Sequence, residues 1–139
     1  MSKLKSYISG IGHHVPDRIV TNEDLSKIMD TSDQWISDRT GIKERRYVKE
    51  GVGPSDLAIP AVEKALEYAQ LDKDDIELII FATISPDYYL PGAGCLLQDK
   101  MSFSNIGALD IRAGCSGFIY GLSIADQYIK AGTYKNILL

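Results

Sequence analysis

The chain has 139 residues, 45% of them hydrophobic, and a formal net charge of -4 at pH 7. This length and composition predict one globular domain with a substantial core and exclude a disordered chain. The acidic balance argues against broad binding to nucleic acid or to an anionic membrane surface. No apolar stretch approaches the roughly 20 residues of a membrane span, and the first residues lack the apolar core of a signal peptide. We therefore expect a cytoplasmic protein.

The pattern of apolar residues, glycines and prolines predicts alternating strands and helices. In chain order, the expected elements are a strand at 6–12, helices at about 22–30 and 32–39, an exposed charged segment at 43–48, a helix from 55 to about 69, a strand at 76–84, a helix at 91–100, a strand at 106–111, a helix at 117–130 and a strand at 135–139. Capping-box patterns start the first two helices at Thr21 and Thr31, and Gly41 ends the second. Because Pro60 lies near the start of the helix from 55, we expect a kink there or a later start.

The apolar run at 76–84 predicts a strand that is covered on both faces, as in a parallel sheet between helices. Together with the alternation of strands and helices, it indicates an α/β fold with right-handed crossovers. The last strand stops with the chain, and such an edge offers unpaired backbone groups to another chain. We therefore expect a fragment, or one half of a fold whose second half lies elsewhere.

The two cysteines, Cys95 and Cys115, lie twenty positions apart, without a CxxC pair or a Cys/His cluster. This spacing predicts neither a zinc site nor a disulfide framework, and we expect both thiols to be reduced. The acidic run at 72–77 lacks the glycine and the terminal glutamate of a calcium loop. The glycine pair Gly10 and Gly12 lacks the third glycine of a dinucleotide-binding motif. We therefore expect no metal and no nucleotide cofactor.

Cys115 is the strongest candidate for a functional residue. The run at 109–118 (LDIRAGCSGF) predicts a buried strand that turns sharply into a helix, with the sulfur at the turn. The unpaired N–H groups and the dipole of a helix start favour the thiolate, which attacks acyl carbonyls. Gly114 and Gly117 keep the turn free of Cβ atoms, so a substrate carbonyl and its pantetheine arm can approach. The alternative is a buried, unreactive thiol, which is our interpretation of Cys95.

Four motifs make the chain resemble β-ketoacyl-acyl carrier protein synthase III. They are residues 30–36 (DTSDQWI), 39–45 (RTGIKER), 115–118 (CSGF) and 125–132 (ADQYIKAG). The resemblance covers the whole chain, 1–139, but only the N-terminal half of the family's thiolase-like α/β fold, a mixed sheet covered by helices. It implies an acyltransferase of fatty acid biosynthesis. In this family a cysteine takes an acyl group from acyl-CoA. The acyl group is then joined to malonyl-acyl carrier protein, with loss of carbon dioxide.

The resemblance assigns roles to four residues. Cys115 takes the nucleophile position. Trp35 is implied to stack on the adenine of coenzyme A, with Thr31 and Arg39 along the nucleotide and phosphate path, roles that suit a flat indole and a guanidinium. From the residues alone, Trp35 would be a core or interface aromatic and Arg39 a solvated helix charge. Coenzyme A enters only as the substrate thioester, and a homodimer is implied, with its interface through the strand and loops before the cysteine.

The chain departs from the family pattern near its acyl site. Arg112 and Gly114 stand where initiating members carry small residues, often alanines, and Leu90 replaces an aromatic that shapes the acyl pocket. These changes resemble relatives that condense other acyl-CoAs, as in secondary metabolism. The family's catalytic histidine and asparagine belong to the other half of the fold, and we expect His13 and His14 to be surface or packing residues. The alternative to an enzyme is therefore a catalytically silent assembly module or a truncated product.

Overall fold

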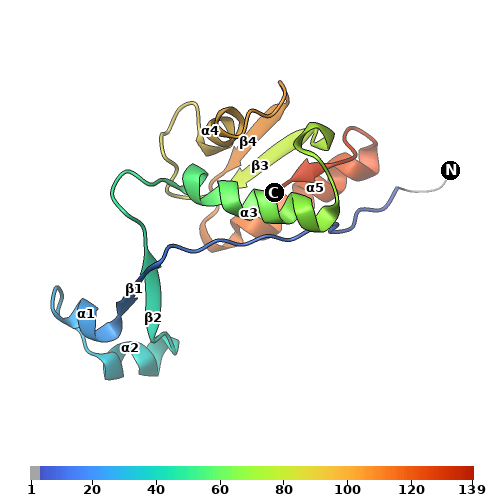
Figure 1. Ribbon diagram of the computed structural model, residues 1–139. Helices are drawn as coiled ribbons and strands as arrows, with labels where there is room; N and C mark the ends of the chain where they lie inside the picture. Colours follow the sequence, from blue (N-terminus) through green and yellow to red (C-terminus); the bar gives the residue numbers. More distant parts are fainter. Residues whose placement is uncertain (1–3) are drawn as a thin grey trace. The chain divides into compact units, whose positions relative to one another are not determined.

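The computed structural model describes residues 4–139. The chain forms two compact units (Figure 1), which we treat separately. The small unit is Val15–Val52, and the large unit combines Gly53–Leu139 with the described N-terminal residues up to His14. Within the described range, none of the helices is both long enough and apolar enough to cross a membrane.

The small unit pairs two strands and packs two short helices against them. Its elements, in chain order, are β1 (Arg18–Thr21), α1 (Asn22–Ser26), α2 (Asp33–Thr40) and β2 (Glu44–Tyr47). β1 and β2 are antiparallel, with Arg18 opposite Tyr47. One residue each from β1, α1 and α2 forms the buried core of the unit, namely Val20, Leu25 and Ile36.

The helices of the small unit follow their predicted caps closely. Thr21 caps α1, because its hydroxyl accepts the backbone N–H of Asp24 while the Asp24 carboxylate accepts the N–H of Thr21. The cap of α2 lies one residue later than predicted, at Ser32, whose hydroxyl accepts the N–H of Trp35. Gly41 ends α2 in the left-handed conformation, with φ of 70°. The local signals are therefore confirmed, with a shift of one residue at α2.

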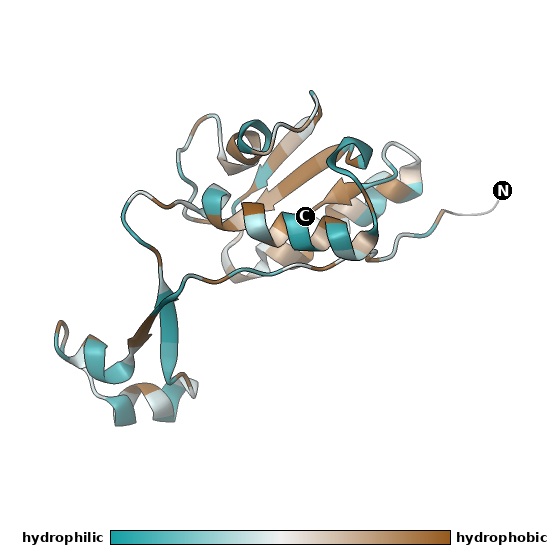
Figure 2. Ribbon diagram, viewed as in Figure 1, coloured by the Kyte–Doolittle hydropathy of each residue, from teal (hydrophilic) through white to brown (hydrophobic). Residues whose placement is uncertain are grey.

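The strand pair of the small unit was not expected. Residues 43–48 were predicted to run as an exposed charged segment, and they are largely exposed, but they contain β2. Figure 2 shows β2 as hydrophilic along its length. The side chains of β2 are exposed or half-buried, so hydropathy gave no sign of this strand.

The large unit contains a parallel sheet of three strands. Its elements, in chain order, are α3 (Pro54–Ala69), the 3₁₀ turn η1 (Lys73–Asp75), β3 (Leu78–Ala82), α4 (Ala93–Lys100), β4 (Gly107–Ile111), the 3₁₀ turn η2 (Gly114–Ser116), α5 (Gly117–Ala131) and β5 (Ile137–Leu138). The strand order is β4-β3-β5, and Leu78 lies opposite both Gly107 and Ile137. The predicted parallel sheet between helices is confirmed.

β3 is the centre of the large unit. Its residues Ile79 and Ile80 are almost completely shielded from solvent, and Figure 2 shows the strand as hydrophobic throughout. Ile79 packs with Val62 of α3 and with Leu97 of α4. On the opposite face, Ala82 lies close to α5. A Cβ atom added at Gly117 of α5 would be 3.3 Å from the Cβ atom of Ala82. β3 is therefore covered on both faces, as its apolar run predicted.

In the large unit, the strand predicted at 6–12 is wrong, and so is one of the two alternatives for the helix from 55. Residues 6–12 form no strand: the segment runs beside α3, where a Cβ atom at Gly10 or Gly12 would overlap a backbone carbonyl oxygen of the helix. A cavity separates this segment from β5, and among the described residues it has no strand partner. The later start of the helix at 55 is also wrong, because α3 begins at Pro54 and contains Pro60 in its interior.

Candidate active site

Cys115 lies on η2, between the end of β4 and the start of α5, as the sequence predicted. The turn closes where the N–H of Ser116 donates to the carbonyl of Ala113 at 3.1 Å. Gly114 has φ of 54°, a left-handed conformation that side chains rarely adopt, so this position needs glycine. The Cys115 side chain is exposed, whereas Cys95 is half-buried on α4. The turn therefore presents its thiol at the surface, at the N-terminal end of α5.

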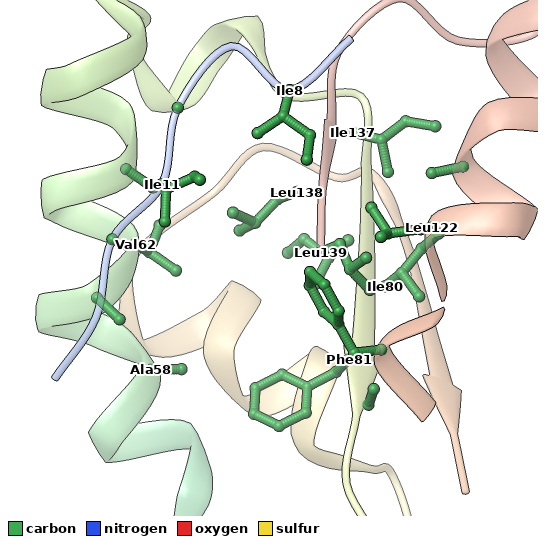
Figure 3. A pocket seen from close by; sticks show the side chains of 18 of the residues that line it. Ile8, Ile11, Ala58, Val62, Ile80, Phe81, Leu122, Ile137, Leu138 and Leu139 are labelled. Atoms are coloured by element: carbon green, nitrogen blue, oxygen red, sulfur yellow. The ribbon is translucent and has the colours of Figure 1, made fainter. Parts of the chain in front are cut away.

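An apolar cavity of about 760 Å³ lies beside Cys115. Gly114 and Cys115 line it together with the N-terminal segment, α3, β3, α5 and β5. Figure 3 shows its apolar side chains, among them Ile8, Ile11, Val62, Phe81, Leu122 and Leu139. Such a lining can take up hydrocarbon. Leu90, the predicted acyl-pocket residue, is not among the residues that line this cavity.

Trp35 and Arg39 lie one turn apart on α2, in the small unit. The guanidinium carbon of Arg39 is 4.3 Å from the centre of the Trp35 ring, and Arg39 donates a hydrogen bond to the Trp35 carbonyl at 3.4 Å. The indole is 53% exposed, which excludes the core position that the sequence left open. Thr31 lies just before α2, and its buried hydroxyl has no hydrogen-bond partner among the described residues. All three residues therefore lie in the small unit, while Cys115 belongs to the large unit.

Leu90 lies in the connection at 83–92 between β3 and α4. This residue is 87% exposed, and the two tyrosines before it are 65% and 79% exposed at Tyr88 and Tyr89. The connection therefore presents three large side chains in succession to solvent, although polar contacts hold its backbone in place.

Asp87 anchors the start of this connection. Its carboxylate accepts the hydroxyl of Ser55 at 2.7 Å and the N–H of the same residue at 3.2 Å, and Ser55 is completely buried. The ammonium of Lys100 donates to the Ser55 hydroxyl at 2.7 Å and also binds the carboxylate of Asp56. That contact lowers the pKa of Asp56, with the Gly53 N–H as a second donor. The network joins the connection to α3 and to the end of α4.

Two further residues anchor the connection from β4. Asp110 accepts the N–H groups of Ala93 and Gly94, at 2.8 and 2.9 Å, and so caps the start of α4. Arg112 stacks its guanidinium on the ring of Tyr89, 4.6 Å from the centroid, and donates to the Tyr89 carbonyl at 3.2 Å. Sequence reasoning missed Asp87 and Asp110. The sequence offered only a weak sign, since the N-cap of this helix, Gly92, has no side chain that could accept these N–H groups.

His13 and His14 are both exposed in the N-terminal segment, as expected. Among the described residues, their one polar contact involves a backbone group and not an imidazole: Lys64 donates to the carbonyl oxygen of His13 at 3.0 Å. Neither imidazole is part of the cavity beside Cys115.

Comparison with known proteins points to one family. A sequence model of the 3-oxoacyl-[acyl-carrier-protein (ACP)] synthase III family matches residues 109–139, which contain the end of β4, Cys115 and α5. The β-ketoacyl-[acyl-carrier-protein] synthase III of Clostridioides difficile is 53% identical to this chain, over 97% of the chain and 41% of that protein.

The same similarity appears in solved structures. The crystal structure of 3-oxoacyl-[acyl-carrier-protein] synthase III from Aquifex aeolicus is 47% identical and superposes with a TM-score of 0.88, over 94% of this chain and 42% of that one. The priming β-ketosynthase of the R1128 polyketide pathway is 27% identical, with a TM-score of 0.87, over 97% of this chain and 41% of that one.

The chain spans about two fifths of the length of the curated relatives that it matches. The predicted resemblance is confirmed along nearly the whole chain, and so is the predicted α/β fold class. In sequence and in thiolase-like fold, the chain therefore corresponds to the N-terminal half of β-ketoacyl-[acyl-carrier-protein] synthase III.

Proposed function

We propose that residues 1–139 are the acyl-accepting half of a cytoplasmic β-ketoacyl-acyl carrier protein synthase III of fatty acid biosynthesis. The observation that carries this proposal is the exposed thiol of Cys115, on a glycine-containing turn at the start of α5. The turn belongs to the segment that matches the family model. Its relatives are named for the condensing reaction, and the acyl-transfer half of that reaction needs a nucleophile of this kind.

The proposed transfer follows from the chemistry of a thioester. The Cys115 sulfur attacks the carbonyl carbon of acyl-CoA, and a tetrahedral intermediate forms with negative charge on oxygen. Its collapse keeps the new carbon–sulfur bond to Cys115, breaks the bond to the sulfur of coenzyme A, and releases coenzyme A, which takes up the proton. Unpaired N–H groups at the start of a helix stabilise negative charge near the turn.

We assign the coenzyme A path to residues of α2 and to Thr31, which lies just before its cap. The exposed face of the Trp35 indole suits the adenine, and the adjacent Arg39 guanidinium suits the phosphates. The hydroxyl of Thr31 is buried and free of protein partners among the described residues, so it can donate to the nucleotide once a side-chain rotation exposes it. Because Arg39 stacks on the indole, the base takes the other ring face or displaces the guanidinium.

Condensation with malonyl-acyl carrier protein needs more than this half. In the family, the histidine and asparagine that complete the site come from the second half, so we propose that another polypeptide segment supplies them here.

We also propose a homodimer through β4 and the connection at 83–92. β4 is an edge strand among the described residues, and Leu90, which we assign to the acyl pocket, projects into solvent from that connection.

A second candidate is condensation of another acyl-CoA in secondary metabolism. Two observations favour it. The priming β-ketosynthase of the R1128 polyketide pathway shares the fold, and Arg112 stands where initiating members carry small residues. Both candidates use Cys115 in the same way, so the preferred acyl donor separates them.

Intact-protein mass spectrometry tests the proposal. The 139-residue chain is incubated with short, branched and medium acyl-CoAs, beside Cys115→Ala and the matched control Cys95→Ala. We expect an acyl mass shift in the wild type and in Cys95→Ala, and none in Cys115→Ala. If no donor acylates the chain and Cys115 also resists alkylation, acyl transfer is refuted and the silent assembly module is supported.

A further inference from the structure

The connection at 83–92 presents large side chains without packing them. Tyr88, Tyr89 and Leu90 are each more than half exposed, so hydrophobic burial within this chain does not fix their directions. An unpacked connection of this kind samples several conformations unless polar contacts hold its backbone. The position of Leu90 therefore depends on those contacts.

Arg112 makes the contact nearest to Leu90. It donates to the carbonyl of Tyr89, which belongs to the peptide unit that joins Tyr89 to Leu90, at 3.2 Å. Its guanidinium also lies on the Tyr89 ring, 4.6 Å from the centroid. A hydrogen bond and a stacking contact from one planar group fix both the peptide plane and the ring before Leu90.

Arg112 also lies close to the nucleophile along the chain. It directly follows β4, which ends at Ile111, and it precedes Cys115 by three residues. β4 is fixed in the sheet by its pairing with β3, so the backbone of Arg112 starts from a rigid element. The side chain therefore connects the strand that leads to Cys115 with the backbone that carries Leu90.

We propose that Arg112 is a positioning residue that fixes the Tyr88–Leu90 segment relative to the β4–Cys115 connection. A consequence of this positioning, which rests on the proposed function, is that Arg112 sets the preference among acyl donors by holding Leu90 in place. Asp87 and Asp110 hold the two ends of the same connection, but Arg112 contacts its middle. The proposal gives a role to Arg112, one of the residues that depart from the family pattern.

Chymotrypsin cleavage tests the positioning role without relying on activity. Chymotrypsin cuts after exposed tyrosines, and its rate rises with the fraction of time that a segment is free to enter the protease. We expect cleavage after Tyr88 and Tyr89 to be about fivefold faster in Arg112→Ala, close to that rate in Arg112→Gln, and intermediate in Arg112→Lys. The lysine retains a donor but lacks the flat group that stacks.

Arg18→Ala is the matched control, because Arg18 also stacks on a tyrosine, Tyr47, at 5.7 Å but in the small unit. We expect this variant to leave cleavage at Tyr88 and Tyr89 unchanged. Circular dichroism identifies any variant that has unfolded. If Arg112→Ala is unfolded, the Arg112→Gln and Arg112→Lys variants provide the test. Unchanged cleavage in folded Arg112 variants would overturn the positioning role.

The acyl-CoA panel tests the consequence for specificity. We expect the ratio of acylation rates between the best and second-best donors to change about fivefold in Arg112→Ala, and to recover partly in Arg112→Lys. Faster cleavage with an unchanged donor ratio would refute control of specificity by Arg112. If the wild type accepts no donor, the proposed function fails, and the cleavage rates alone decide whether Arg112 holds the segment.

Discussion

At the scale of single residues, glycines decide where two backbones can touch. The sequence placed Gly10 and Gly12 at the end of a predicted strand, as an incomplete dinucleotide-binding motif. The structure gives them another role, because both lie against the backbone of α3, at Ala65 and Ala61. A side chain at either position would push the N-terminal segment away from the helix.

Gly12→Ala tests this role. Because the added Cβ atom would overlap the Ala61 carbonyl oxygen, we expect the free energy of unfolding to fall by about 1–3 kcal/mol, as for other overpacked sites. Urea denaturation measures it. The control is Ser9→Ala, at an exposed position of the same segment, for which we expect a change within about 0.5 kcal/mol. Equal effects of the two substitutions would contradict the close packing.

At the scale of elements, agreement between sequence and structure follows how local each signal is. The cap of α1 depends on residues within one turn, and it was predicted correctly. The buried face of α5 depends on the sheet, and hydropathy does not identify it. The apolar side chains of Phe118, Ile119 and Tyr128 are exposed, while Gly117 and Gly121 are buried. The helix approaches its neighbours through glycines, which hydropathy does not rank as a contact face.

The cap of α1 predicts a dependence on pH. Hydrogen bonds, first from Lys27 and then from Thr21, lower the pKa of Asp24 from 3.8 to about 2. A carboxyl with a lowered folded pKa stabilises the fold fully above its unfolded pKa, and this stabilisation is lost as the pH falls through the folded value. The stability difference between wild type and Asp24→Asn should therefore be constant above about pH 5 and narrow progressively toward pH 2.

Urea denaturation from pH 7 to pH 2.5, with NMR titration of the Asp24 carboxyl, measures this dependence. Lys27→Met is the informative control, because it removes the main donor and should raise the titration midpoint toward 3.8. A midpoint near 4 in the wild type would contradict the capping box.

At the scale of the whole molecule, the open edges of the sheet are the most consequential feature. β3 has a partner on each side, whereas β4 and β5 each have one among the described residues. The apolar cavity lies between β5 and the N-terminal segment, whose backbone is also without a strand partner in the described structure. Exposed edges of this kind favour pairing with other strands.

We therefore expect the chain to self-associate through β4. Sedimentation velocity over a range of concentrations should show a monomer–dimer equilibrium. Leu109→Asp, which places a charge on partly exposed Leu109 of β4, should raise the dissociation constant about tenfold. Tyr68→Asp is the control, because Tyr68 is exposed on α3, and it should leave the equilibrium unchanged. Equal effects of both variants would exclude β4 as the interface.

The sequence by itself determined the features that depend on nearby residues. These are the Cys115 turn, the caps at Thr21 and Gly41, the buried strand β3 within the apolar run at 76–84, and the family motifs. Periodicity, capping and turn chemistry act within a few positions, so they can be recognised along the chain.

Tertiary structure alone decided which distant groups meet. It paired β1 with β2, left residues 6–12 without a strand partner among the described residues, and brought Arg112 to Tyr89 and Asp87 to Ser55. These contacts join residues that are more than twenty positions apart. Such contacts form only when the folded chain closes the loops between them. Patterns among neighbouring residues carry no information about which loops close.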